Sequence, residues 1–474
     1  MNNTFSIIEY QAFSKEDLKE NFKERAERFY KELEDFAKNN EIFLGFKNKN
    51  TLKAKNYVGI IQTKSGVLEI LPKCMDLEKL EENEPSSEDK EKLKEDTNSK
   101  YDKEKLKKYY ELENISKNDD CYKKDCEINP SILLINMLKT LKNYPFKKSQ
   151  ISSLQIAKMP LFEVFITMFL DEFDSVYKKG LMRSYVSSEE NRTFLKGKLL
   201  FNEHIKSNLI HKERFFTSSD EFVLDIAPNR LIKSTLNFLK SKTSLNKFKI
   251  IKAMQMLDEV EFSTNYEKDF SFKISRHFDY YENILSWCKI FLQNQSFAPY
   301  KGKNEAFALL FPMEKLFENY VAYMFKLANP SKNIKTQSSG KYLISKNDEK
   351  CFMLKPDLYI ENKMILDTKW KIPDDNEDEK KHGISQSDLY QMFAYANKYE
   401  IKEIYLIYPL CERTFDLREK LKTKDIKFLA QGFLKACDEH VKFKVFFAPL
   451  LFKTSNLVLV SIFVQCFCQV YGSF

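Results

Sequence analysis

Two short apolar runs, Met353 to Ile360 and Met364 to Trp370, flank a polar triplet of Glu, Asn and Lys at residues 361–363. Short apolar runs on either side of polar turn-forming residues are typical of two strands joined by a tight turn. The pattern predicts a β-hairpin centred on Asn362.

The predicted hairpin brings acidic side chains together. Residues equally distant from Asn362 face each other, so Asp357 lies opposite Asp367. Directly opposed side chains are about 5 Å apart, and two like charges there destabilise a sheet unless something compensates them. Lys369 falls on the same face as Asp367, because side chains alternate faces with a period of two. Carboxylate oxygens suit Mg²⁺, which takes one or two carboxylates together with a phosphate, and the pattern therefore predicts a phosphodiester-cleaving site.

The segments on either side of this hairpin are predicted to be a helix, and a helix followed by a strand. Met313 to Leu327 is apolar at helical spacing and carries Glu314 and Glu318. Downstream, Ser385 and Asp388 have the spacing of a capping box, which opens a helix that extends to about Tyr399. Asp388, Gln391 and Tyr395 share one face of that helix, and Glu403 to Leu410 alternates like a strand.

The N-terminal part of the chain also has clear periodicities. After a short apolar segment at Phe5 to Tyr10, Ser14 and Asp17 open a helix that is expected to reach Ala37 with an apolar stripe. Tyr57 to Gln62 and Val67 to Leu71 form a second predicted hairpin around Lys-Ser-Gly. Four further segments have helical spacing, the last with Trp287 in its core: Ser131 to Leu141, Leu161 to Tyr177, Leu231 to Met256 and Tyr280 to Leu292.

These patterns divide the chain into five regions of a multidomain α+β or α/β protein. We expect an N-terminal mixed α/β domain at 1–75, a mostly helical middle domain at 128–262, and a domain with the candidate site at 263–450. Residues 76–127 carry mixed-sign charge and few large apolar residues, which favours an exposed helix or mobile insertion over a partner-binding arm. The apolar tail at 451–474 lacks charge from Asn456 onward, and its composition favours buried strands over a membrane span.

Composition narrows the functional classes. The net charge of +8 fits either simple solubility or attraction to nucleic acid. The nine cysteines contain no CxxC pair, which argues against zinc, and with no signal peptide we expect a cytoplasmic protein with reduced thiols. No GxxxxGK[ST] loop is present, so this chain has no recognisable means of binding GTP or ATP by itself.

Basic and aromatic residues interleave between Arg192 and Arg230. Such a segment contacts phosphates and bases in some proteins and is a solvated basic face in others, and both interpretations remain open. The candidate contacts with DNA or a partner are Lys196, Lys198 and Arg230.

Several phrases carry a resemblance to known proteins. Pro356-Asp357 followed ten residues later by Asp367-Thr368-Lys369 resembles the PD-(D/E)xK nuclease superfamily. The whole segment from Tyr57 to Leu410 resembles the McrC family, the nuclease subunits of McrBC modification-dependent restriction systems. The phrases that carry this second resemblance are GVLEILPK at 66–73, LKGKL at 195–199, Asn-Arg at 229–230, LFENYVAYMF at 316–325 and ISQSDLYQMFAYA at 384–396.

The resemblance implies a restriction-endonuclease-like αβββαβ core and a metal-dependent endodeoxyribonuclease. Asp357, Asp367 and the carbonyl of Thr368 would hold Mg²⁺, with Glu318 completing the shell and Glu314 as the fallback. Lys369 would orient or deprotonate the attacking water, and Gln391, Tyr395 and Asp388 would support the site or contact DNA.

The resemblance also implies partners. These are an McrB-like hexameric AAA+ GTPase, which binds the GTP, and double-stranded DNA carrying modified bases such as 5-methylcytosine. The resemblance further implies that the N-terminal part of this chain, with the domain at 1–75 on the partner-binding side, attaches to the GTPase and that the chain stimulates its GTP hydrolysis. No membrane is implied. Two alternatives remain open at this point, a RecB-like repair nuclease that acts alone and a non-catalytic adaptor that activates an AAA+ motor.

Overall fold

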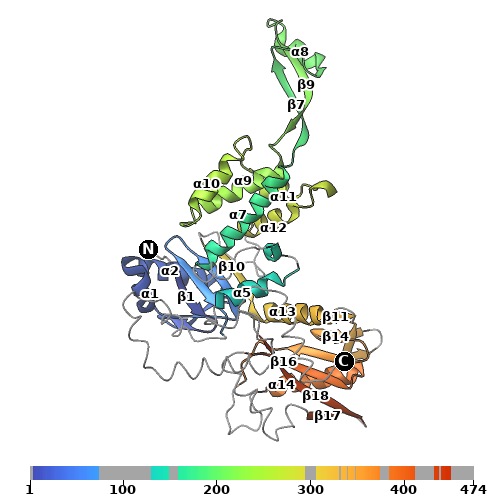
Figure 1. Ribbon diagram of the computed structural model, residues 1–474. Coiled ribbons are helices and arrows are strands. Elements are labelled where there is room, and N and C mark those ends of the chain that lie inside the picture. Colours follow the sequence, from blue (N-terminus) through green and yellow to red (C-terminus); the bar gives the residue numbers. More distant parts are fainter. Residues whose placement is uncertain are drawn as a thin grey trace, which may run out of the picture. The chain divides into compact units, whose positions relative to one another are not determined.

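The computed structural model describes residues 4–73, 130–142, 144–148, 159–293, 306–329, 333–338, 340–346, 349–373, 384–410, 432–436 and 439–449. The chain divides into two compact units (Figure 1). The first takes its described residues from Met1–Lys142 and Phe297–Phe474, and the second is built mainly from Met159–Ser296. The predicted insertion at 76–127, the tail at 451–474 and most of the acidic loop after Pro373 lie outside the described residues.

A four-stranded sheet in the first unit joins the N-terminal part of the chain to a strand far along the sequence. Its order is β1 (Thr4–Ile8), β6 (Val67–Leu71), β5 (Tyr57–Gln62) and β10 (Phe307–Pro312). The β5–β6 hairpin has the predicted bounds, with Gln62 opposite Val67. The sequence did not predict β10, which pairs antiparallel with β5 although more than two hundred residues separate them.

The first predicted helix is in fact two helices, α1 (Lys15–Phe22) and α2 (Ala26–Asn39), joined by the 3₁₀ turn Lys23–Arg25. The break falls at Lys23, whose φ of 49° is incompatible with a continuous α-helix. The apolar stripe nevertheless stays buried, and it forms one core with Ala308 and Leu310 of β10. A small sheet of β2 (Ala12–Phe13), β4 (Thr51–Ala54) and β3 (Leu44–Asn48) and the helix α5 (Pro130–Lys139) also belong to this unit.

Helices form most of the second unit. They are α7 (Leu161–Lys179), α9 (Ala227–Lys240), α10 (Lys247–Gln255), α11 (Tyr266–Phe270) and α12 (Tyr281–Leu292), with short 3₁₀ segments at Pro145–Lys148 and Arg276–Phe278. The predicted helix from Leu231 to Met256 is divided because Glu163 of α7 accepts hydrogen bonds from Thr243 and Ser244 in the intervening turn. Trp287 is 1% exposed and packs on Phe146 and Phe291, which confirms its core position.

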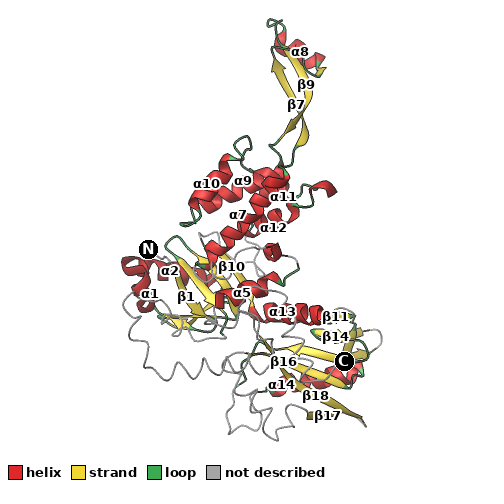
Figure 2. Cartoon of the chain, in the orientation of Figure 1, coloured by secondary structure: helices red, strands yellow, loops and turns green. Residues whose placement is uncertain are grey.

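The expected mostly helical middle region also contains a long two-stranded arm (Figure 2). Strand β7 (Ser184–Arg192) pairs antiparallel with β9 (Phe215–Val223), and β8 (Lys198–Leu199) and α8 (Phe201–Asn208) lie between them in sequence. At the base of the arm, the side-chain amide of Asn229 donates hydrogen bonds to the carbonyls of Met182 and Leu224. These bonds fix the two points where the chain enters and leaves the arm.

A six-stranded mixed sheet completes the first unit. Its order is β11 (Ile334–Thr336), β14 (Leu358–Ile360), β15 (Met364–Thr368), β16 (Glu403–Leu410), β18 (Glu439–Pro449) and β17 (Gly432–Ala436). Helix α13 (Met313–Ala328) precedes β11, and α14 (Gln386–Tyr399) connects the parallel strands β15 and β16. Met392, Tyr395 and Ala396 of α14 form a core with Ile365 of β15 and Leu406 of β16.

The predicted apolar run from Met353 to Ile360 is two strands rather than one. Its first residues end β13 (Glu349–Leu354), which pairs with β12 (Lys341–Lys346) in a separate hairpin. Pro356 falls between β13 and β14, and a proline removes the backbone donor that a continuous strand needs. Within the described residues, no helix is long and apolar enough to cross a membrane.

Gly59 tests the pairing of β5 with β10. Its φ is 134°, and a Cβ there would lie 2.0 Å from the carbonyl oxygen of Leu309. We expect Gly59→Ala to lower the free energy of unfolding by at least about 2 kcal/mol, because backbone strain and a backbone clash add. Urea unfolding followed by circular dichroism measures the change.

The matched control is Gly45→Ala in β3, where the atoms closest to the added Cβ belong to the flexible end of the Lys55 side chain. It should change the free energy of unfolding by less than about 1 kcal/mol. Equal effects of the two substitutions would contradict the close approach of β10 to β5.

Candidate active site

The hairpin of β14 and β15 has the predicted register. Leu358 pairs with Leu366 and Ile360 with Met364, which confirms the centre at Asn362. Asn362 itself has a φ of 56°, a conformation that asparagine tolerates better than most residues. Asp357 directly precedes β14, and its Oδ2 accepts hydrogen bonds from the Thr368 backbone amide at 2.8 Å and from the Thr368 hydroxyl at 2.6 Å.

Asp367 and Lys369 form a buried ion pair beside Asp357. The Lys369 Nζ lies 2.6 Å from Oδ2 of Asp367, whose side chain is 2% exposed. Burial, and then the negative charge of Asp357, raise the pKa of Asp367 to about 7, although Lys369 opposes the change. Burial alone would lower the pKa of Lys369, but its acidic neighbours, Asp367 first, more than offset this, so the pKa is raised and the amine stays charged.

Helix α14 holds the lysine from the other side. The Lys369 amine donates to Oε1 of Gln391 at 2.8 Å, and the Gln391 amide donates to the hydroxyl of Tyr395 at 2.8 Å. The Tyr395 hydroxyl in turn donates to the carbonyl of Lys355 at 3.0 Å. The helical face predicted from the sequence is therefore present, and it links Lys369 to the segment just before Asp357.

Asp388 has a partner that the sequence analysis missed. The hydroxyl of Ser385 accepts a hydrogen bond from the Asp388 amide, as expected for a helix cap, but the Asp388 carboxylate pairs with Lys371 at 2.8 Å. Lys371 follows Lys369 by two residues. Because side chains along an extended chain alternate with a period of two, this spacing could have indicated that Lys371 lies on the same face as Lys369.

Glu318 on α13 lies close enough to Asp357 for the two carboxyl groups to interact electrostatically. Its pKa is raised by burial and then by the charge of Asp357. Its carboxylate accepts hydrogen bonds from the Gln337 amide at 2.6 Å and from the Lys315 amine at 2.7 Å. Glu314 instead lies near Glu9 and Tyr10 in the N-terminal part, where burial is the main cause that raises the pKa of both groups and the charge of Glu314 adds to it. This geometry favours Glu318 over Glu314 as the companion of the acidic pair.

Gln337 is a site residue that no sequence pattern indicated. Its backbone amide donates to the carbonyl of Asp357 at 2.9 Å while its side chain holds Glu318. Its φ of 46° lies in the left-handed region, which is costly for a residue with a side chain. Gln337 thus connects the two acidic positions through a strained backbone.

The donor set suits a hard divalent cation. Two opposed carboxylates, one of them buried with a raised pKa, form a negative cluster that a cation would relieve. Within the described part of the chain, no group of three or more Asp, Glu, His or Cys side chains is gathered in a metal-binding arrangement. The third candidate, Glu318, is hydrogen-bonded to Gln337 and Lys315. The protein would therefore supply at least two carboxylate ligands, those of Asp357 and Asp367, to a bound cation.

The three basic candidates on and beside the arm differ in their surroundings. Lys196 pairs with Glu221 at 2.9 Å, and Arg230 pairs with Asp225 at 2.7 Å. Lys198 is exposed in β8 opposite Ser218. The ion pairs of Lys196 with Glu221 and of Arg230 with Asp225 give both basic residues a structural role. Contact with DNA or a partner stays a prediction for all three candidates.

The fold and the site define a multidomain α+β protein with a buried acid–lysine centre at a sheet hairpin. The chain belongs to the McrBC family, because the family model for the McrBC 5-methylcytosine restriction system component matches residues 52–409. No curated protein matches the chain.

Two solved structures from Thermococcus gammatolerans are similar to this chain. One is a refined half-complex from a tetradecameric assembly of McrB AAA+ hexamers with bound McrC, with 17% identity and a TM-score of 0.63 over 98% of this chain and 100% of that chain. The other is a cryo-EM structure of the McrBC complex, with 19% identity and a TM-score of 0.42 over 68% of this chain and 87% of that chain. At this level of identity, the first likeness shows a shared fold.

The raised pKa of Asp367 predicts how stability depends on pH. The folded state keeps the Asp367 proton up to about pH 7, whereas the unfolded chain releases it near the ordinary aspartate pKa of 3.8. Unfolding therefore releases a proton between these values, and stability falls as the pH rises from about 4 to about 7. Lys369 stays charged throughout this range and adds no slope.

Asp367→Asn removes this dependence. Between pH 5 and pH 8 the wild type should lose up to about 3 kcal/mol relative to Asp367→Asn, because one pKa unit corresponds to about 1.4 kcal/mol. Denaturant titrations of both proteins at several pH values in EDTA measure the difference. Parallel pH profiles for the two proteins would contradict a buried carboxyl that keeps its proton.

Proposed function

We propose that this chain is the Mg²⁺-dependent DNA-cleaving subunit of an McrBC-type restriction complex. The observation that carries the proposal is the convergence of Asp357, Asp367 and Lys369 at one hairpin. The order α13, β11, β14, β15, α14, β16 supports a PD-(D/E)xK core, with β12 and β13 as an inserted hairpin.

Each residue of the site has a role in phosphodiester hydrolysis. Asp357 and Asp367 would hold Mg²⁺ with the carbonyl of Thr368 and with Glu318, and the bound metal supplies charge neutralisation at the scissile phosphate. Lys369 orients the attacking water and stabilises negative charge on the phosphate oxygens. Its raised pKa favours this role over that of a general base. The product would carry a 5′-phosphate and a 3′-hydroxyl.

Gln391 and Tyr395 keep Lys369 in place. Their chain of hydrogen bonds ends on the backbone of Lys355, so the amine is fixed between the sheet and α14. A lysine on a free four-carbon stem would lose this alignment, and misplacement of about 1 Å can cost a hundredfold in rate. Asp388 has a parallel role toward Lys371.

The partner would be an McrB-like hexameric AAA+ GTPase that binds GTP and recognises double-stranded DNA with modified bases. One similar structure is described as McrB AAA+ hexamers with bound McrC. The arm offers a surface for such a partner, because large apolar side chains that are exposed together mark interaction sites. The side chains on and near α8 and on β7 and β9 that are more than half exposed are Tyr185, Phe194, Leu195, Phe201, Ile205, Leu209, Ile210 and Phe222.

Substitutions at the site should separate cleavage from partner activation. We expect Asp367→Ala and Lys369→Ala to reduce cleavage of 5-methylcytosine DNA at least about a hundredfold, since each removes charge stabilisation at the phosphate. Stimulation of the partner's GTPase should stay within about twofold of wild type. Gel assays of cleavage and phosphate release with the McrB-like GTPase, GTP and Mg²⁺ measure both activities.

Lys363→Ala is the matched control, because Lys363 lies in the turn of the same hairpin and is exposed. It should leave both activities unchanged. Cleavage by Lys369→Ala at the wild-type rate would contradict the proposed active site. Cleavage by the wild type without partner or GTP would favour a RecB-like repair nuclease, and GTPase stimulation without any cleavage would favour an adaptor.

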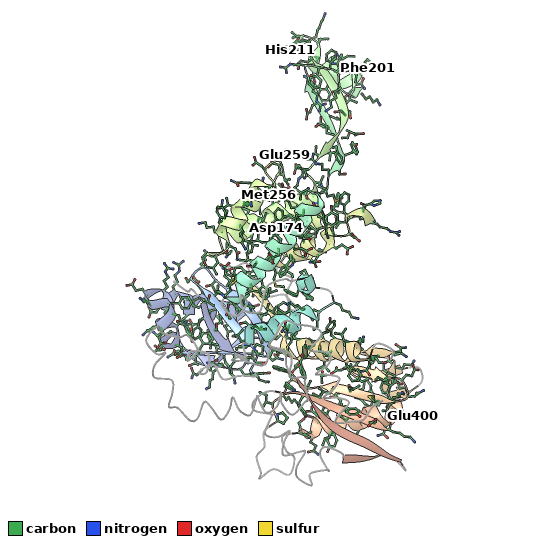
Figure 3. All side chains as sticks on the ribbon, viewed as in Figure 1. Asp174, Phe201, His211, Met256, Glu259 and Glu400 are labelled. Carbon is green, nitrogen blue, oxygen red and sulfur yellow. The ribbon has the colours of Figure 1, made fainter. Side chains whose placement is uncertain are left out.

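The arm can be tested independently of cleavage. Phe201 and Ile205 lie one helical turn apart on α8 and are 69% and 59% exposed. Figure 3 shows Phe201 toward the far end of the arm, near His211. We expect the double substitution Phe201→Asp and Ile205→Asp to weaken binding to the McrB-like GTPase at least about tenfold, because charge disrupts an apolar contact.

Biolayer interferometry with the immobilised GTPase measures this affinity. Phe248→Asp is the control, since Phe248 is 79% exposed on α10, away from the arm strands. Unchanged affinity for the double variant would place the partner surface elsewhere.

A further inference from the structure

Two residues at the end of the N-terminal sheet, Glu9 and Lys73, contact Trp370, the residue that follows Lys369. The indole N–H of Trp370 donates to Oε1 of Glu9 at 2.5 Å, and the backbone amide of Lys73 donates to the same oxygen at 3.1 Å. The Lys73 amine donates to the carbonyl of Trp370 at 3.2 Å. Each residue thus contacts the other two, and we call this cluster the Glu9–Lys73–Trp370 junction.

The N-terminal sheet presents Glu9 and Lys73 together because two of its strands end side by side. Strand β1 ends at Ile8 and the parallel strand β6 ends at Leu71, with the Glu9 amide bonded to the Leu71 carbonyl at 2.9 Å. Lys73 closes the phrase GVLEILPK that carries part of the family resemblance. Both the amide and the amine of this residue make contacts beyond the end of the strand.

The junction is built from buried groups. Glu9 is 2% exposed and Trp370 is 5% exposed. A buried carboxylate is costly unless it is hydrogen-bonded or paired, and here two donors meet one of its oxygens. The Lys73 amine also lies over the ring of Tyr10 at 5.0 Å. Burial and paired contacts of this kind hold side chains in one arrangement.

Trp370 connects this cluster to the candidate active site in two ways. It is bonded directly to Lys369, whose backbone amide donates to the carbonyl of Ile407 in β16 at 2.8 Å. Its ring packs on Phe317 at 5.2 Å, and Phe317 directly precedes Glu318 on α13. A displacement of Trp370 would therefore change the positions of both Lys369 and Glu318.

The N-terminal sheet reaches the same site through the backbone as well. Strand β10 is paired in that sheet and ends at Pro312, and α13 begins at the next residue. The Met313 amide donates to the carbonyl of Asn56 at 3.0 Å, which fixes the first turn of the helix that carries Glu318. The sheet thus holds the start of α13 and the end of β15 at once.

We propose that the Glu9–Lys73–Trp370 junction positions Lys369 for phosphodiester hydrolysis and so makes cleavage depend on the N-terminal sheet. The junction residues act through Lys369 and contact neither the phosphate nor the metal. This inference rests on the proposed nuclease function.

Two substitutions remove different contacts of the junction. Lys73→Met keeps the aliphatic stem and removes the amine that holds the Trp370 carbonyl. Trp370→Phe keeps a ring against Phe317 and removes the indole donor to Glu9. Lys73→Arg keeps both the charge and the donors, so it should restore the function that Lys73→Met loses.

The experiment uses the full chain with the McrB-like GTPase, GTP, Mg²⁺ and 5-methylcytosine DNA. It measures the single-turnover cleavage rate at saturating DNA, the DNA dissociation constant of the complex, and GTPase stimulation. We expect Lys73→Met and Trp370→Phe to lower the cleavage rate about 10- to 100-fold, as loss of alignment does. DNA affinity and GTPase stimulation should stay within about twofold, and Lys73→Arg should lie within about threefold of the wild-type cleavage rate.

Three results would overturn the proposal. The first is wild-type cleavage by both Lys73→Met and Trp370→Phe. The second is parallel loss of cleavage, DNA affinity and GTPase stimulation, which a merely structural role predicts. The third is failure of Lys73→Arg to restore cleavage. Lys369→Ala in the same assay distinguishes failure of the junction proposal from failure of the proposed active site. Undiminished cleavage by that variant means that the proposed active site itself is wrong.

Discussion

The ion pair between Asp367 and Lys369 is the interaction on which the rest of the site depends. The Asp367 side chain is 2% exposed, so its ionised form depends on the Lys369 amine 2.6 Å away, and even with this partner the pKa of Asp367 is raised to about 7. Asp357 adds a second negative charge next to the first. Such an arrangement stabilises no fold by itself, and the proposed hydrolysis of phosphodiesters, which needs two acids and an amine together, would account for its presence at one hairpin.

The elements around this pair are arranged to hold it. The hairpin register brings Asp357 to the backbone and hydroxyl of Thr368. Helix α14 supplies Gln391 to the lysine, and α13 supplies Glu318 beside Asp357. The N-terminal sheet contributes β10, which leads directly into α13, and contacts Trp370 immediately after the lysine. The first unit is therefore one assembly in which residues from both ends of the sequence support one site.

Local sequence information was sufficient to predict the turn and register of the β14–β15 hairpin, the cap of α14 and the helical face with Gln391 and Tyr395. In each case the determining residues lie within a few positions of each other, as Ser385 and Asp388 do. Family resemblance pointed to Glu318, and the structure places it rather than Glu314 near the acidic pair.

The features that the sequence did not reveal are nonlocal or lack a pattern. Strand β10 is apolar throughout, and nothing in its residues identifies β5 as its partner. The arm strand β7 reads SYVSSEENR and has mostly exposed residues, so it has no buried face to give a period of two. Gln337 and the contact of Glu9 with Trp370 depend on tertiary structure alone. The break at Lys23 reflects a backbone conformation that the helical spacing of its neighbours conceals.

The most direct test of the central claim is a diffraction experiment on crystals of the full chain soaked in Mn²⁺, which has an anomalous signal and replaces Mg²⁺ at oxygen sites. The proposed site predicts an anomalous peak bonded to carboxylate oxygens of both Asp357 and Asp367. Well-ordered carboxylates without a peak between them, or a peak only at other residues, would contradict a metal-dependent nuclease centre at this hairpin.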